Sequence, residues 1–171
     1  MSLLNKSYRW QDLKRGVDYA AACARLSLEY YHGEHRADLV AAIQIAERYA
    51  AGKEIDQHAA YAAASHAAAA GHAAITRAAD AAADAADAAA IGVTDAARAA
   101  AYTRAAARAA ADAGVDQDEI DALWRDAVAQ DLGATPGSDG YFAACAALAI
   151  GNVDLARDLA SGERSHAGDT P

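Results

Sequence analysis

The sequence predicts an all-α protein, an alanine-rich multi-helix bundle followed by a short C-terminal helical hairpin. Alanine occupies 33 of the 55 positions from Ala59 to Ala113, and alanine has the highest helix propensity because it loses no side-chain entropy. Upstream, large apolar residues recur every three or four positions, which is the period of one helix face. Glycines and capping residues divide the chain into segments of helical length. Because an alanine methyl buries little surface, such helices have to pack unusually close together.

Two helices with larger side chains are predicted before the alanine-rich stretch. The first extends from about Ser7 to Tyr31 and ends before Gly33. The second extends from about Arg36 to Ala51 and ends at Gly52. The residues predicted to face inward are Tyr19, Cys23, Leu26 and Tyr30 on the first helix and Leu39, Ile43, Ala46 and Ala50 on the second.

Four further helices are predicted up to residue 132, and we treat residues 1–132 as one bundle. They span about 57–70, 72–90, 96–113 and 117–132. The candidate N-caps are Asp56, Thr94 or Asp95, and Asp116. Gly92 and Gly114 are the candidate ends, and Gly71 either breaks its helix or allows close packing with a neighbour. Residues 133–140 have the composition of a linker. We expect a helical hairpin over 141–160 and a disordered tail over 161–171.

Charge and composition limit the classes of partner. The formal net charge is −9, which disfavours nucleic acid and anionic membranes and favours a basic protein partner. No run of 18 apolar residues and no N-terminal signal region occur, so we expect a cytoplasmic protein. Cys23 and Cys145 are expected to be small buried hydrophobes rather than a disulfide. Alanine faces that pack closely are consistent with helix contacts within one chain or with a homodimer interface.

An acidic stripe and a few aromatic residues are the candidate partner-binding positions. Asp80, Asp84 and Asp87 share one face of a predicted helix. They are either a solvated face, one side of a contact with the stacked Arg104 and Arg108, or a docking surface for a basic partner. The remaining candidates are Tyr30, Tyr31, Tyr102 and Trp124, as interface anchors or core residues, and Glu34 and His35 in an exposed turn.

No catalytic, metal or cofactor motif is recognised. Glu29 and His32 form one Glu-x-x-His pair, but di-metal bundles need that pair on two helices plus two further Glu residues. Ser65 and His66 are adjacent helical positions and point about 100° apart, with no strained nucleophile turn. We therefore expect a protein that is not an enzyme and holds no cofactor.

One stretch of the chain resembles a known family. Residues 19–53, YAAACARLSLEYYHGEHRADLVAAIQIAERYAAGK, resemble the opening hairpin of the Imm5-like immunity proteins, where an aromatic residue precedes a Cys-Ala-Arg helix and a second helix ends in an aromatic residue before Gly-Lys. Residues 59–74, AAYAAASHAAAAGHAA, are similar to that family's next helices. The chain departs from the family at Glu34 to Ala37, where an Asp-Arg-Pro-like turn is expected. The resemblance implies a protein that neutralises a toxin by binding it, and it identifies no binding residue.

Three functions are consistent with these observations. The first is a non-catalytic immunity-type inhibitor whose acidic helical surface occludes a bacterial toxin, for example a nuclease with a basic cleft. The second is a helical scaffold or adaptor, of which a phage-encoded inhibitor of a nucleic-acid-binding defence complex is a variant. The third, a metal protein on a ferritin-like bundle, would carry bound metal when purified.

Overall fold

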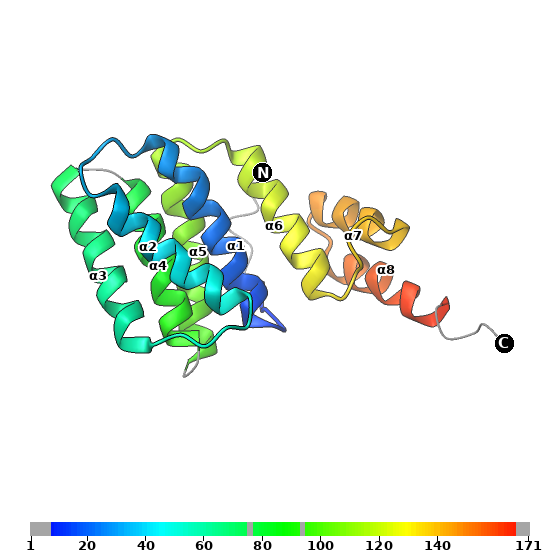
Figure 1. The fold of residues 1–171 in the computed structure, drawn as a ribbon. Coiled ribbons are helices and arrows are strands. Elements are labelled where there is room, and N and C mark those ends of the chain that lie inside the picture. The colour runs from blue at the N-terminus through cyan, green and yellow to red at the C-terminus, as the bar shows by residue number, and fades with distance from the viewer. Residues whose placement is uncertain (1–7, 75–76, 93–94, 167–171) are drawn as a thin grey trace.

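The computed structural model describes residues 8–74, 77–92 and 95–166, and all regular structure in these ranges is helical. The fold class predicted from the sequence is therefore confirmed. The elements, shown in Figure 1, are α1 (Leu13–Ser27), the 3₁₀ turn η2 (Leu28–Tyr30), α2 (Arg36–Ala50), α3 (Gln57–Ala74), α4 (Arg77–Gly92), α5 (Ala96–Ala113), α6 (Gln117–Asp131), α7 (Asp139–Ala149) and α8 (Val153–His166).

α4 is the central helix of the bundle. It packs against α1, α2, α3 and α5, and these four also pack in sequence around it, α3 on α2, α2 on α1 and α1 on α5. Ten of its alanines are buried, together with Ile91. Only small side chains let four helices approach one helix this closely. The alanine content of α4 therefore allows it to occupy the central position.

Two hydrogen bonds connect the ends of α4 to neighbouring helices. The buried Ser27 hydroxyl of α1 lies 3.3 Å from the Ala78 carbonyl oxygen of α4. At the opposite end of α4, the Gln57 side-chain amide donates to the Ala90 carbonyl oxygen at 3.0 Å. Each bond joins an end of α4 to a different neighbour.

Several helix boundaries differ from the predicted ones. α1 begins at Leu13 rather than near Ser7, since the Asp12 side chain accepts from the Lys14 N–H and caps it there. α3 continues through Gly71 to Ala74 and α4 begins only at Arg77. A glycine inside a helix costs about 1 kcal/mol relative to alanine, which the packed alanine helix around it outweighs. The expected breaks at Gly52 and Gly114 are confirmed, with φ of 72° and 112°.

The C-terminal helices form an arm on α6. α7 and α8 pack on each other and on α6, and α6 packs mainly on α1; Figure 1 shows this arm extending away from the bundle. The expected hairpin is present, with α7 capped by the Ser138 hydroxyl. α8 continues to His166, so the tail expected to be disordered from Ser161 is helical up to that residue, and 167–171 lie outside the described residues.

A buried carboxylate ties the N-terminal segment to the end of α6. Asp131 accepts three hydrogen bonds, from the Tyr8 hydroxyl at 2.6 Å and from the backbone N–H groups of Gln11 and Asp12 at 2.8 Å each. Tyr8 also makes edge-on contacts with the rings of Trp10 and Trp124, at centroid distances of 5.0 and 6.3 Å. Burial raises the pKa of Tyr8 far above its ordinary value, and the bond to Asp131 adds to this shift. The hydroxyl therefore stays a donor to Asp131.

Candidate functional site

The acidic stripe of α4 lies on the open side of the bundle. α1, α2, α3 and α5 cover α4 except between α3 and α5, which are not a packed pair. Along that gap runs a groove of about 360 Å³ whose floor carries Asp80, Asp84 and Asp87. Its α5 wall carries Arg108 and Asp112. The three aspartates are thus half-buried in a groove, instead of lying on a fully solvated helix face as one sequence interpretation held.

The charges in this groove, which we call the acidic groove, are only partly balanced. Arg77 forms an ion pair with Asp80 at 3.0 Å. Within the described part of the chain, no cationic side chain lies within 4 Å of the carboxylates of Asp84 or Asp87. Arg104, considered as a pairing partner from the sequence, is exposed and does not line the groove. The groove lining therefore contributes four carboxylates and two guanidinium groups.

The pKa values of the floor carboxylates reflect this imbalance. Burial, together with the smaller effect of the charges of Asp87 and Asp80, raises the pKa of Asp84 to about 7. Burial also raises the pKa of Asp87, while the Arg98 guanidinium lowers it. Like charges at successive turns of one helix disfavour the ionised state. A cation placed on this floor would relieve that repulsion.

The walls and one end of the acidic groove suit an elongated cationic partner. Alanines from α3, α4 and α5 line it between the charges (Ala68, Ala83, Ala105 and Ala109). Arg98 lies 5.9 Å over the Tyr102 ring on α5. The hydroxyl of Tyr102, and more weakly that of Tyr61 on α3, raises the pKa of Arg98. Tyr61 is 42% exposed.

The other sequence candidates lie outside this groove. Tyr31 and Trp124 are 2% and 5% exposed and belong to the core, so neither can anchor a partner on the surface. Tyr30 is 43% exposed and lies against Gly114 at the end of α5. Glu34 and His35 are exposed in the turn before α2, where the His35 imidazole lies 3.3 Å from the Asp38 carboxylate.

A second exposed surface was missed in the sequence. On α7, Phe142 is 60% exposed, and Ile150, the C-cap residue of this helix, is 77% exposed. Ala146 and Ala149 between them are exposed as well. The sequence does contain a signal for this surface. α7 is an 11-residue helix with Asp139 as its only charged residue. A helix that is apolar all round is normally buried on all sides, so such a helix near the end of a chain calls for a covering partner.

Other classes of site are not found in the described ranges. No group of three or more His, Cys, Asp or Glu side chains lies close enough together there to hold a metal ion. None of the described helices has the length and apolar character that crossing a bilayer requires. Cys23 and Cys145 are both free thiols.

Comparisons with known proteins found no match, so the function has to be inferred from the structure of the site. No protein-family model matches the chain, and neither a curated protein nor a solved structure matches it. The resemblance to the Imm5-like immunity proteins rests on the residues quoted above and stays a prediction.

Proposed function

We propose that this protein is a non-catalytic inhibitor of the immunity type, which neutralises a cognate bacterial toxin by taking basic side chains of the toxin into the acidic groove. The observation that carries the proposal is the floor of that groove, where no cationic side chain of the described residues lies within 4 Å of half-buried Asp84 or Asp87. The groove volume falls in the range of about 300–1,000 Å³ that is usual for ligand sites.

Charge supports a protein partner and gives it a kinetic advantage. The chain carries a formal net charge of −9, which steers a basic partner toward it at a rate that falls as salt screens the charges. Aspartates spaced by four and three residues match Lys or Arg side chains at the same spacings on a partner helix. A phage-encoded inhibitor of a nucleic-acid-binding complex would use the same surface and the same charge complementarity.

The test is partner capture followed by a charge-matched comparison. Tagged protein is incubated with a lysate of the source cells at low and high salt, and the retained partner is purified. Its affinity is then measured for the wild type, for the triple variant Asp80→Asn, Asp84→Asn and Asp87→Asn, and for a control triple variant, Glu54→Gln, Asp139→Asn and Asp158→Asn. Both variants replace three carboxylic acids by amides, but the control positions are exposed and lie outside the groove.

The two variants separate a specific groove from a general effect of net charge. We expect the groove variant to bind at least about tenfold more weakly and to lose protection of cells that express the partner, while the control keeps most of both. Equal weakening in both variants would contradict a role for the groove. A captured partner that is not toxic to cells would refute the immunity function while leaving the groove in place.

A helical adaptor is the second candidate function, and the exposed outer face of α7 favours it. Phe142 and Ile150 offer an apolar surface on an arm that packs mainly on α6 among the described helices, and exposed apolar patches often mark protein contacts. Under this function, a Phe142→Ser and Ile150→Ser variant would lose partner capture and the groove variant would keep it.

A further inference from the structure

The contact between α1 and α6 is the main connection between the bundle and the C-terminal arm. α7 and α8 pack mainly on each other and on α6, and α6 packs mainly on α1 and only weakly on α5. The covalent connection from α5 to α6 is short, residues 114–116, and begins at Gly114, whose φ is 112°. The position of α6–α8 on the bundle therefore depends on one helix contact and one short link.

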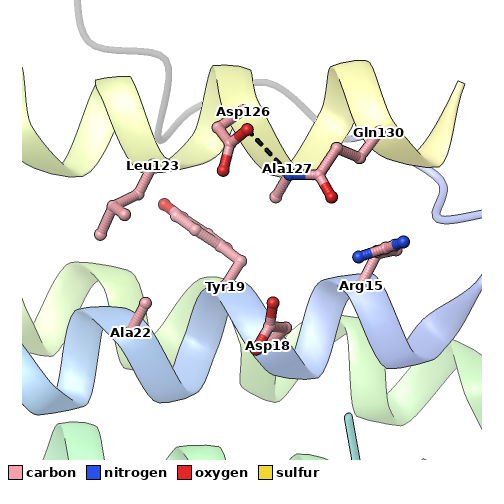
Figure 2. Close-up of a pocket in the computed structure, with 8 residues that line it drawn as sticks. All are labelled: Arg15, Asp18, Tyr19, Ala22, Leu123, Asp126, Ala127 and Gln130. Atoms are coloured by element: carbon pink, nitrogen blue, oxygen red, sulfur yellow. Dashed lines mark hydrogen bonds between the residues drawn. The ribbon is translucent and has the colours of Figure 1, made fainter. Parts of the chain in front are cut away.

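The side chains along this contact do not form hydrogen bonds from one helix to the other. Figure 2 shows Arg15 and Asp18 on α1 and Asp126 and Gln130 on α6, around a small pocket of about 40 Å³. The dashed line in this view joins Gln130 to Asp126, and both residues belong to α6. Over the described lengths of α1 and α6, no hydrogen bond and no ion pair within 4 Å joins a side chain of one helix to the other helix. Packing alone joins the two helices here.

The segment before α1, residues 8–12, supplies hydrogen bonds that the helix contact lacks, and we call this segment the strap. The Asp131 carboxylate at the end of α6 is 9% exposed. It accepts from the Tyr8 hydroxyl at 2.6 Å and from the backbone N–H groups of Gln11 and Asp12 at 2.8 Å each. Hydrogen bonds to a carboxylate are about twice as strong as those between neutral groups. The strap is therefore bonded to the end of α6 that lies farthest along the chain from the link at 114–116.

The strap is also anchored to α1. The Trp10 ring packs over Gly16 of α1, where an added Cβ would lie 3.0 Å from the ring. Asp12 connects the two sides, because its backbone N–H donates to Asp131 while its side chain accepts from the Lys14 N–H and caps α1. The three hydrogen bonds to Asp131 therefore join α6 to a segment that is fixed on the bundle.

We propose that the strap is a latch, whose hydrogen bonds to Asp131 hold α6–α8 on the bundle, and that without them α6–α8 swings as one unit about residues 114–116 while α1–α5 stay folded. Native proteins open in such contiguous units, with the rest of the fold intact. A few residues at the end of a helix are enough to absorb the backbone rotation of a hinge. The latch is independent of the acidic groove and of the proposed function, because its residues lie outside that groove.

The distance between two spin labels, one on the bundle and one on the arm, tests the latch in the intact chain. The labels are attached at Gln44→Cys on α2 and Asp158→Cys on α8, which are exposed positions, in a chain that also carries Cys145→Ala. Cys23 is fully buried and stays unlabelled. Far-UV circular dichroism measures the helix content of every variant. We expect one narrow distance distribution in this parent chain.

Two variants release the latch by different amounts. Asp131→Asn keeps the size of the side chain but turns an amide N–H toward the donors, and we expect it to broaden the distance distribution at least about twofold at unchanged helix content. Tyr8→Phe removes one of the three hydrogen bonds and should broaden the distribution less. Tyr141→Phe is the matched control, because it removes a hydrogen bond of 2.7 Å from a tyrosine to Asp126 inside the arm. It should leave the distribution as it is in the parent.

Three results would overturn the proposal. If the distribution stays as narrow in Asp131→Asn as in the parent, packing alone holds α6 on α1. If the parent itself gives a broad distribution, the strap does not hold the arm. If Asp131→Asn and Tyr8→Phe both lose helix content along with the distance, the chain unfolds as one cooperative unit and α6–α8 does not move separately.

Discussion

Replacing Asp84 by asparagine removes a carboxylate that the fold holds in an unfavourable charged state at neutral pH. Burial on the groove floor, with Asp87 and Asp80 nearby, raises its pKa from 3.8 to about 7. A shift of this size would correspond to about 4 kcal/mol if the group were fully shielded from solvent. Because Asp84 is open to solvent through the groove, we discount this to about 1–2 kcal/mol.

The sign of the effect follows from the direction of the shift. Between pH 4 and pH 7 the folded chain holds a proton on Asp84 that the unfolded chain has released, so the stability of the wild type falls as pH rises through this window. Above pH 7 the penalty is complete, and below pH 4 it disappears. The asparagine variant lacks this penalty at every pH, and asparagine has a helix propensity similar to that of aspartate.

Circular dichroism melting at several pH values measures the difference. At pH 8 we expect Asp84→Asn to raise the Tm by about 2–8 °C, and this gain should shrink steadily as the pH is lowered to about 4. The control Asp158→Asn, at an exposed position of α8, should change stability by less than about 0.5 kcal/mol at each pH. If Asp84→Asn lowers the Tm at pH 8, or raises it equally at pH 4 and pH 8, the reasoning about a strained groove floor is wrong.

Four further substitutions probe other parts of the fold. Asp131→Ala leaves three buried or half-buried donors without their acceptor, so we expect urea unfolding followed by tryptophan fluorescence to show a loss of about 2–4 kcal/mol. A Cβ at Gly33 would lie 2.5 Å from the hydroxyl oxygen of buried Tyr31, so Gly33→Ala should cost about 1–3 kcal/mol in the same assay. Gly162→Ala should be neutral or slightly stabilising, because an added Cβ would meet no group outside its own helix turn within 4 Å. Phe142→Ser should change stability by less than about 0.5 kcal/mol in the same assay, because the side chain is 60% exposed.

The sequence alone predicted most helices of this protein, because helix formation here depends on local preferences. The N-caps Asp95 and Asp116 and the left-handed Gly114 were recognisable from residue type and position, and the structure confirms all three. The ends that were predicted wrongly lie near Gly71 and at the start of α1, where a weak local signal competes with packing or with a hydrogen bond to a distant residue.

The candidate site was predictable only in part. The three aspartates were recognised as one stripe, but their burial depends on α3 and α5 standing on either side of α4. Tyr31 and Trp124 were named as anchors or core residues, and only their neighbours decide that both are core.

Sequence by itself determined that the chain is helical, where most helices begin and end, and that its surface is acidic, because propensity, capping and charge belong to individual residues. The tertiary structure decided which face of each helix is buried. An alanine-rich helix such as α4 is nearly equally apolar on most sides, so its pattern cannot say which neighbours cover it. In the part of the chain that the structure describes, packing places four helices around α4 and leaves a gap between α3 and α5, and that arrangement turns a stripe of aspartates into a groove.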